Sequence, residues 1–244
     1  MRGVEGELAV KSLASRQREE EWMDRPDVDP GELHQSLQFI RRVNRWLGYT
    51  RATISHLERF SARWKKGERI TMIDFATGSG DVPVEILNWA DRKGHHVKIV
   101  GVDLHAETSR AAREATGDVR LQVVRGDVLN LPFEEGSFDY AITSMFLHHL
   151  SEEEVVRVLS AMDRVSRRGI IAADLLRDRR AYNWACVFTA FSNSIVKHDA
   201  RVSVRQAFNR EEVLAMRDRA GVGYAKFHSH FGHRFVLAGE RLSR

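Results

Sequence analysis

The chain has 244 residues, and 38 lysines and arginines against 34 aspartates and glutamates give a formal charge of only +4 at pH 7. This length suits one domain with additions, and no run of about 18 apolar residues is present that would predict a transmembrane helix. Residues 1–21 are charged, unlike a secretory signal peptide, and the single cysteine excludes an internal disulfide framework, so a cytoplasmic location is expected.

The first part of the chain predicts an arm followed by helices. Residues 1–21 form a charged arm or a charged helix. Between residues 32 and 64 apolar side chains recur at helical spacing and are interrupted near Gly48, which predicts two helices. We therefore assign residues 1–64 to an N-terminal arm and a helical cap, expected to pack over the functional cleft. Residues 65–244 form the main domain.

From residue 70 onward strand patterns alternate with helical patterns, which indicates a layered α/β sheet. Seven strands are predicted, at 71–76, 98–104, 121–126, 138–144, 169–174, 224–230 and 234–238. Helices are predicted between them, at 82–93, 106–116, 152–165 and 210–220. A tight turn at 231–233 joins the last two strands as a hairpin, so the last strand is expected to run antiparallel to the others.

The connection between strands five and six is too long for a plain crossover. It includes residues 177–208, and residues 182–191 within it are apolar and aromatic. Two interpretations are open. The insertion is an extra core helix, or a lid over the carboxyl ends of the strands, where open α/β sheets bind ligands, and the two interpretations are compatible.

The most informative segment is Ile70–Gly80, in which an apolar strand runs into a turn of small residues and then into a helix. Gly78 and Gly80 have no Cβ, so backbone N–H groups and a helix N-terminus can approach a ligand closely. Asp103 ends the second strand, where a carboxylate can accept hydrogen bonds from both ribose hydroxyls. Asp127 ends the third strand, where its carboxylate can accept from the exocyclic amine of a base.

This order of motifs resembles the class I S-adenosylmethionine-dependent methyltransferases over about residues 70–240. The resemblance implies a three-layer, Rossmann-like fold with S-adenosylmethionine as the cofactor and S-adenosylhomocysteine as the product. NAD binding is the main rival, but the later paired glycine that it would need is missing. By this resemblance the cofactor-binding residues are Asp74, Ala76, Thr77, Gly78, Gly80, Asp103, Leu104, Asp127, Val128 and Ser144.

Ala76 departs from the family's pattern, which has glycine at this position. Its methyl group narrows the approach of the backbone to the methionine moiety. If the position needs a positive φ, Ala76 is also strained by roughly 1–2 kcal/mol. This departure keeps a second hypothesis open, in which the fold is a non-catalytic binding module for a protein partner.

The segment after the fourth strand favours an oxygen acceptor over the amine of a base. Family members that methylate exocyclic amines carry Asn or Asp followed by two prolines and an aromatic residue, whereas this chain has Met145–Leu150. His148 and His149 in this segment are candidate catalytic bases, because histidine titrates near neutral pH. The structural alternative is that they only open the next helix. His198, in the insertion, is the third catalytic candidate.

The acceptor is expected to be a small apolar, aromatic or polyketide-like molecule. Residues 20–30 and 174–180 look similar to methyltransferases of bacterial polyketide pathways, which implies a role in secondary metabolism. A quinone-type C-methyltransferase shares most of the same motifs and is the alternative. The residues expected to line the acceptor pocket are Trp46, Tyr49, Trp184, Phe188 and Phe191.

Metal and nucleic acid receive weaker support. His228, His230 and His233 cluster at the closing hairpin, but no Cys or carboxylate shares their spacing, so no metal is predicted. Basic pairs such as Arg167 and Arg168 are the basis for a third hypothesis, an RNA or protein methyltransferase. A dense basic stripe interleaved with aromatic residues is missing, and we expect no nucleic-acid partner. The oligomeric state is left open, a homodimer included.

Overall fold

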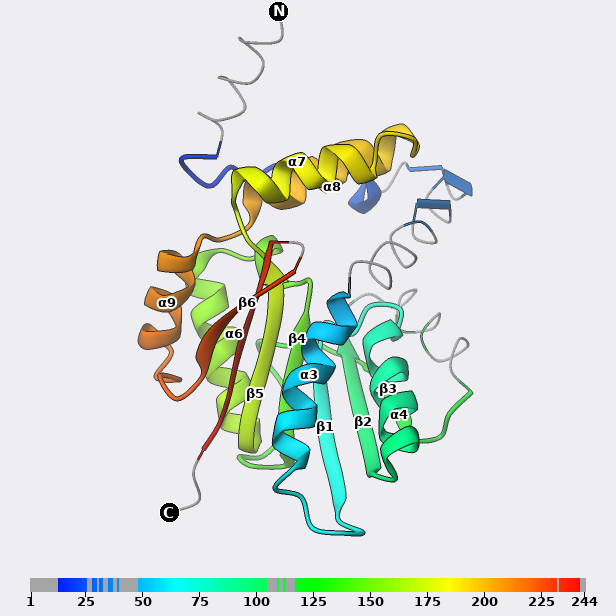
Figure 1. The fold of residues 1–244 in the computed structure, drawn as a ribbon, viewed down its shortest axis with the longest axis vertical. Helices are drawn as coiled ribbons and strands as arrows, with labels where there is room; N and C mark the ends of the chain where they lie inside the picture. Colours follow the sequence, from blue (N-terminus) through cyan, green and yellow to red (C-terminus); the bar gives the residue numbers. More distant parts are fainter. Residues whose placement is uncertain are drawn as a thin grey trace, which may run out of the picture.

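The computed structural model describes residues 13–25, 28–29, 31–32, 35–36, 39, 48–104, 109, 112, 117–231 and 233–241. Its centre is a seven-stranded sheet in the order β3-β2-β1-β4-β5-β7-β6 (Figure 1). The strands are β1 (Arg69–Phe75), β2 (His96–Asp103), β3 (Leu121–Arg125), β4 (Phe138–Ser144), β5 (Ser166–Leu175), β6 (Lys226–His230) and β7 (Arg234–Glu240). Strands β1 to β5 run parallel, whereas β7 runs antiparallel to its neighbours β5 and β6.

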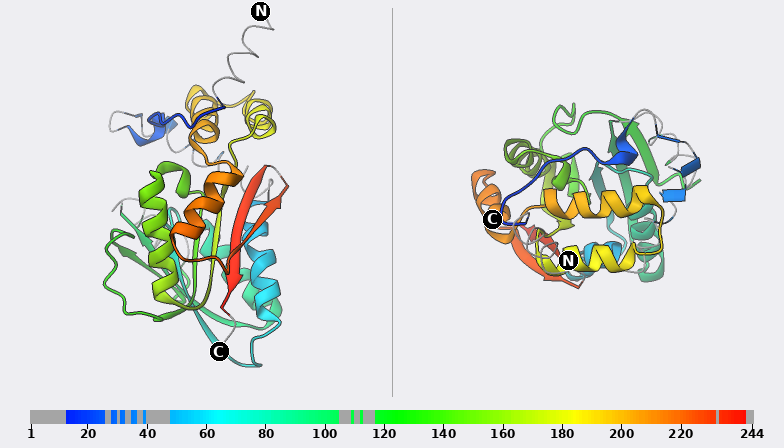
Figure 2. Two further views of the ribbon diagram at one scale, coloured as in Figure 1. Left: turned by 90° about the vertical axis from the view of Figure 1, so that its left-hand side faces the viewer. Right: turned by 90° about the horizontal axis from the view of Figure 1, so that it is seen from above.

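Helices cover both faces of the sheet and make three layers (Figure 2). The described helices are α3 (Tyr49–Ser61), α4 (Asp81–Lys93), α6 (Glu152–Val165), α7 (Arg179–Phe188), α8 (Ser194–Gln206) and α9 (Arg210–Arg219). Helices α3 and α4 pack on one face, and α6 and α9 pack on the other. None of these helices is long and apolar enough to cross a membrane.

The central strands are apolar on both sides because both faces of the sheet are covered. Met72 and Ile142 point to the core under α3 and α4, whereas Ile73 and Ala141 point to the core under α6 and α9. Neighbouring residues of a strand point to opposite faces, so each strand contributes to both cores. The apolar runs in the sequence are therefore the two-sided interior of a buried sheet.

Helix α6 illustrates how local sequence fixes an element. Ser151 and Glu154 form a capping box, in which Ser151 Oγ accepts from Glu154 N and Glu154 Oε2 accepts from Ser151 N at 2.8 Å. Apolar side chains then recur every three or four residues along the helix, and this face is buried. The cap sets where the helix starts, and the apolar face sets which side meets the sheet.

Three segments meet above the carboxyl ends of the parallel strands. Helices α7 and α8 contact each other and lie across this end of the sheet (Figures 1 and 2). The arm at residues 13–25 includes the short helix η1 (Trp22–Asp24), which contacts α8. A second short helix, η2 (Leu147–His149), follows β4 and also contacts α8. Helices α7 and α8, the arm and η2 therefore surround the carboxyl ends of the parallel strands.

The structure confirms the predicted seven-stranded sheet and its antiparallel last strand. The predicted cap is wrong for α3, because Leu57 and Phe60 bury this helix against the sheet face beside α4 and not over the cleft. The physical reason is that this face of β5 and β7 is apolar and needs a cover. The first predicted helix of the cap and the helix predicted at 106–116 lie outside the described residues, apart from isolated positions.

Candidate active site

The turn after β1 holds the backbone in a conformation that favours glycine. Ala76, Gly78 and Gly80 have φ angles of +56°, +55° and +78°. Gly80 is the N-cap of α4, so the N-terminus of this helix faces the turn, where it favours negative or hydrogen-bond-accepting groups. The positive φ at Ala76 confirms the expected strain, about 1–2 kcal/mol for a residue with a Cβ.

Two buried acids hold this turn in place. Thr77 Oγ1 donates to Asp74 Oδ2 at 2.7 Å, and Gly78 N donates to Asp103 Oδ2 at 2.9 Å. Asp74 is 2% exposed, and burial, with the charge of Asp103 as a further contribution, raises its pKa to about 7. Gly101 pairs with Asp74 across the sheet, and a Cβ there would lie 2.7 Å from Thr77 Oγ1. The turn is therefore closed tightly onto β2.

Asp127 lies at the neighbouring strand end, after β3. Gly126 N donates to the backbone oxygen of Asp103 at 2.9 Å, which ties the two strand ends together. Both carboxylate oxygens of Asp127 accept within its own turn, from Leu129 N at 2.9 Å and from Asn130 Nδ2 at 2.6 Å. These bonds fix the orientation of the carboxylate. Its predicted contact with an adenine amine stays a prediction.

The other predicted cofactor residues have different surroundings. Val128 is buried in the core under α6. Leu104 directly follows β2 and is exposed. Ser144 ends β4, and its Oγ is buried without a hydrogen-bond partner among the described residues. A buried hydroxyl in this state is suited to a polar atom of a ligand.

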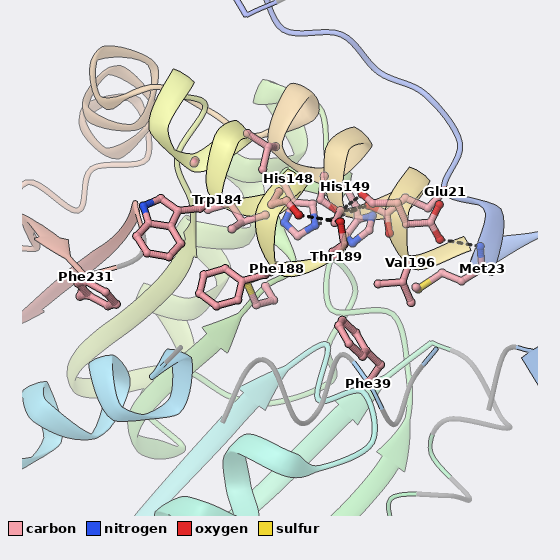
Figure 3. A pocket seen from close by; sticks show the side chains of 18 residues that line it. Glu21, Met23, Phe39, His148, His149, Trp184, Phe188, Thr189, Val196 and Phe231 are labelled. Carbon is pink, nitrogen blue, oxygen red and sulfur yellow. Dashed lines mark hydrogen bonds and ion pairs between the residues drawn. The ribbon is translucent and has the colours of Figure 1, made fainter. Parts of the chain in front are cut away.

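A cavity of about 260 Å³ lies at the same end of the sheet, between η2, α7, α8 and the arm (Figure 3). Most of its wall is apolar, formed by Met23, Phe39, Met145, Leu175, Ala181, Trp184, Ala185, Phe188, Val196, Ala200, Val204 and Phe231. Its polar members are Glu21, His148, His149, Thr189, Asp199 and Ser203. A mostly apolar cavity with a few polar groups is typical of a small-molecule site.

His148 borders this cavity and is hydrogen-bonded to a carboxylate at the end of β5. Its Nδ1 lies 2.7 Å from Asp174 Oδ1, and its backbone N donates to Asp174 Oδ2 at 2.9 Å. Burial acts to lower the pKa of His148, but the carboxylates of Asp174 and Glu21 together outweigh burial and hold this pKa above its ordinary value. Burial acts to raise the pKa of Asp174, and His148 outweighs it and holds that pKa below its ordinary value. The two side chains are therefore a buried, hydrogen-bonded pair in which each favours the charged form of the other.

The other two candidate histidines differ from His148. The His149 ring packs on the His148 ring with centroids 4.1 Å apart, and burial, with His148 as the next cause, lowers its pKa to about 3. The His198 ring instead stacks on Trp22 at 4.0 Å, and its Nδ1 lies 2.9 Å from Asp199 Oδ1. Asp199 lines the cavity, whereas His198 does not. The structure thus brings His148 and His149 together but leaves His198 outside the cavity wall.

Glu21 is a site residue that the sequence did not indicate. The arm carries it into the cavity, where its Oε1 lies 4.0 Å from His148 Nε2. In the part of the chain that the structure describes, Glu21, His148 and His149 are the one group of three side chains arranged to hold a metal ion, with ligand atoms within 4.8 Å of one another. The arm has no periodic pattern that could have revealed this position. Asp174, by contrast, ends a predicted strand next to the strand that leads to His148.

The predicted aromatic pocket is partly present. Trp184 and Phe188 line the cavity and stack with ring centroids 4.9 Å apart. Phe191 is fully exposed and is not part of the wall. Trp46 and the side chain of Tyr49 lie outside the described residues.

The histidines of the closing hairpin lie apart from this cavity. His228 and His230 share one face of β6, as strand alternation predicts, and both rings approach His56 of α3. His56 Nε2 lies 3.0 Å from His230 Nε2. Burial, followed by the charges of both hairpin histidines, lowers the pKa of His56 to about 3. His233 is not part of this cluster, and its Nδ1 lies 3.6 Å from Asp178 Oδ2.

Comparisons with known proteins agree with this geometry. Residues 72–169 match the methyltransferase domain family. A stretch of 103 residues is 34% identical to a demethylmenaquinone methyltransferase of Roseiflexus sp. (strain RS-1) and covers 42% of this chain and 41% of that protein. A 2-phytyl-1,4-naphtoquinone methyltransferase of Nostoc punctiforme is 30% identical over 141 residues, which cover 55% of this chain and 57% of that protein.

The fold extends beyond the matched segment. A plantazolicin methyltransferase, solved in complex with a triazolic desmethylPZN analog and SAH, has a TM-score of 0.66 at 12% identity. The superposition covers 93% of this chain and 81% of that chain, so it includes the helices above the sheet as well as the sheet itself. Residues 72–169 are therefore a methyltransferase domain, and the chain has the class I fold of the S-adenosylmethionine-dependent methyltransferases.

Proposed function

We propose that this chain transfers a methyl group from S-adenosylmethionine to a small apolar, aromatic or polyketide-like acceptor, at an oxygen atom. The observation that carries the proposal is the buried pair of His148 and Asp174, which borders an apolar cavity at the carboxyl end of a methyltransferase sheet. The apolar wall selects an apolar acceptor. The pair of His148 and Asp174 can hydrogen-bond to an acceptor hydroxyl and can stabilise the negative charge that develops on its oxygen as the proton leaves.

The residues at the ends of β1, β2 and β4 fit the proposed cofactor. The glycine turn allows close approach at the N-terminus of α4, and Asp103 borders the same turn through Gly78. Ser144 adds a buried hydroxyl without a partner among the described residues. We assign the methionine moiety to the turn, the ribose to Asp103 and the adenine to Asp127 and Val128. S-adenosylmethionine supplies a methyl group on a sulfonium, and positioning the acceptor in line with it accelerates the displacement strongly.

Among the three candidate histidines we propose His148 as the catalytic one. Asp174 fixes the orientation of its ring by binding Nδ1, so Nε2 is the atom directed toward Glu21 at the cavity wall. His149 is a neutral ring at neutral pH and adds wall beside His148. Helices α7 and α8 supply the aromatic side of the cavity, and we propose that the 177–208 insertion shields the acceptor from water.

A quinone-type C-methyltransferase is the second candidate function. It is supported by the relatives, two of which are named as methyltransferases of demethylmenaquinone and of 2-phytyl-1,4-naphtoquinone. In this version the same cavity holds a hydroxylated naphthalene ring, and a ring carbon receives the methyl group. The two candidates share the cofactor site and differ in which acceptor atom lies in line with the methyl group.

The cofactor proposal is tested by titration calorimetry with S-adenosylhomocysteine. We expect the wild type to bind and Asp103→Ala to bind at least about tenfold more weakly, since it loses the acceptor of the Gly78 N–H and the ribose contact. No binding by the wild type, or equal binding by the variant, would refute it. Transfer of a ¹³C-labelled methyl group to 1-naphthol or to the hydroquinone of menadione, followed by NMR of the product, distinguishes methylation at oxygen from methylation at carbon.

A further inference from the structure

Glu21 is a carboxylate that a distant part of the chain brings into the acceptor cavity. It lies in the arm at residues 13–25 and is 5% exposed. Two backbone N–H groups of η1 donate to the Asp199 carboxylate of α8 at 2.7 and 3.0 Å. On the other side of Glu21, Arg16 donates to the backbone oxygen of His148 at 2.7 Å. The arm is thus fixed to both α8 and η2, and the position of Glu21 between them is set.

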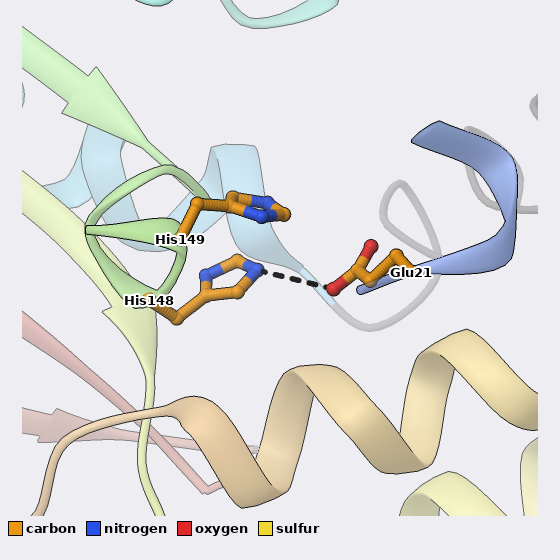
Figure 4. Close-up of side chains that lie close together, drawn as sticks. All are labelled: Glu21, His148 and His149. Carbon is orange, nitrogen blue, oxygen red and sulfur yellow. Dashed lines mark ion pairs between the residues drawn. The ribbon is translucent and has the colours of Figure 1, made fainter. Parts of the chain in front are cut away.

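Side chains of α8 fix the orientation of this carboxylate. Glu21 Oε1 accepts from Ser203 Oγ at 2.6 Å and from Gln206 Nε2 at 3.0 Å. The same oxygen lies 4.0 Å from His148 Nε2. Figure 4 marks this pair of side chains with a dashed line. This separation is longer than a hydrogen bond, for which about 2.7–3.2 Å is usual. Two oriented polar atoms therefore lie near each other in a mostly apolar cavity, too far apart to hydrogen-bond directly.

A single hydroxyl oxygen fits this gap. An oxygen about 2.8 Å from both atoms bridges a separation of 4.0 Å with an angle of roughly 90° at the oxygen. The protons set one condition for this arrangement. Asp174 accepts from His148 Nδ1–H, so Nε2 donates to the oxygen only in the doubly protonated ring, while the hydroxyl donates to Glu21.

We propose that Glu21 and His148 bind one acceptor hydroxyl, and that Glu21 is a second catalytic residue that accepts the proton of this hydroxyl. The Ser203 hydroxyl then donates to its other acceptor, the backbone oxygen of Asp199 at 2.9 Å, which frees a lone pair of Glu21 Oε1 for the proton. His148 Nε2–H then donates to the resulting oxyanion. As the acceptor forms its new bond to the methyl carbon, the carbon–sulfur bond of the sulfonium breaks and its electron pair stays on sulfur. The proton leaves Glu21 to solvent after the product departs.

This inference rests on the proposed function and narrows its substrate class. The acceptor carries an acidic hydroxyl, a phenol or an enol, on an apolar body that suits the apolar wall of the cavity, to which Trp184 and Met145 contribute. Binding of the acceptor hydroxyl by Glu21 and His148 is compatible with both candidate functions. The oxyanion that forms there reacts either at its oxygen or at a ring carbon conjugated with it. The competing occupant of the gap is a divalent cation held by Glu21, His148 and His149.

The test uses the full chain saturated with S-adenosylhomocysteine and two probes, 1-naphthol and 1-methoxynaphthalene, in titration calorimetry. We expect the wild type to bind 1-naphthol at least about tenfold more tightly, since only this probe donates a hydrogen bond to a carboxylate. Glu21→Gln keeps the size of the side chain and is expected to lose this preference. Glu19→Gln is the matched control, because Glu19 lies on the same arm and pairs with Arg205 at the surface.

Methyl transfer gives an independent readout. With any hydroxylated acceptor that the wild type methylates, Glu21→Gln is expected to lose about 10²-fold or more in turnover, whereas Glu19→Gln retains it. Unchanged cofactor affinity in both variants separates this result from failure of the proposed function, in which the wild type itself neither binds the cofactor product nor transfers methyl. Equal preference for 1-naphthol in wild type and Glu21→Gln would overturn the inference. Stoichiometric Zn²⁺ or Mn²⁺ binding in equilibrium dialysis that is lost in Glu21→Gln, with activity abolished by a chelator, would also overturn it.

Discussion

Replacing Gly101 by alanine is expected to disturb the cofactor site from beneath. A Cβ at Gly101 would lie 2.7 Å from Thr77 Oγ1 and 2.9 Å from both Thr77 Cβ and Cγ2. All three distances are shorter than van der Waals contact, so Thr77 has to move. Thr77 carries the hydroxyl that donates to the buried Asp74 and precedes Gly78, whose N–H donates to Asp103. The substitution therefore acts on the whole turn after β1.

The expected cost has two parts. Forcing an extra methyl group into a packed site costs about 1–3 kcal/mol. Removing the Thr77 donor from the buried Asp74 adds about 1–3 kcal/mol. Together they come to about 2–6 kcal/mol in the free energy of unfolding, which corresponds to a drop in melting temperature of roughly 4–24 °C for a domain of this size.

The assays are urea denaturation and titration with S-adenosylhomocysteine. Gly223→Ala is the matched control, because a Cβ there meets nothing within 4 Å. We expect Gly101→Ala to be less stable than this control by the amount above and to bind S-adenosylhomocysteine at least about tenfold more weakly. If the two variants have the same stability and bind with the same affinity, the argument that Gly101 positions the turn is refuted.

Three further outcomes follow from named positions. Ala76→Gly should raise the free energy of unfolding by up to about 1 kcal/mol in urea denaturation, since relief of the left-handed strain exceeds the entropy cost of glycine; a decrease would contradict this strain. Asp174→Asn should lower the pKa of His148 in an NMR titration, because Asp174 holds that pKa up, and an unchanged pKa would contradict the pairing. The pKa of His56 is about 3 when folded and near 6.5 when unfolded, so stability contributed by neutral His56 is lost as pH falls below about 6.5. As the pH is lowered from 7 to 4, the urea midpoint of unfolding should therefore fall more steeply for the wild type than for His56→Gln. Equal dependence of the two midpoints on pH would contradict the lowered pKa of His56.

Much of the cofactor half could be predicted because its signals are local. The apolar strand at Ile70 and the glycines that follow it specify a strand, a turn and a helix within eleven residues. Asp103 and Asp127 are recognisable because each ends an apolar strand, and parallel strands bring their carboxyl ends to one edge. The same logic, applied to the end of β5, would have paired Asp174 with His148.

The acceptor half depends on contacts that no local pattern encodes. Glu21 and His148 are separated by more than half of the chain, and only the hydrogen bonds of the arm to α8 and η2 bring them together. Helix α3 shows the same limit, because its apolar face fits either a cap or a sheet, and the apolar face of β5 and β7 that α3 buries decides between them.

The sequence by itself determined the order of the motifs along the chain and the carboxylates at the strand ends, since these follow from side-chain periodicity over a few residues. It named Ala76 as strained only on the condition of a positive φ, and the structure supplied that angle. The tertiary structure decided which polar groups face each other in the acceptor cavity. It did so because burying His148 requires Asp174 beside it, and burying Glu21 requires the donors of α8. Charges withdrawn from water need partners, and the fold alone supplies them.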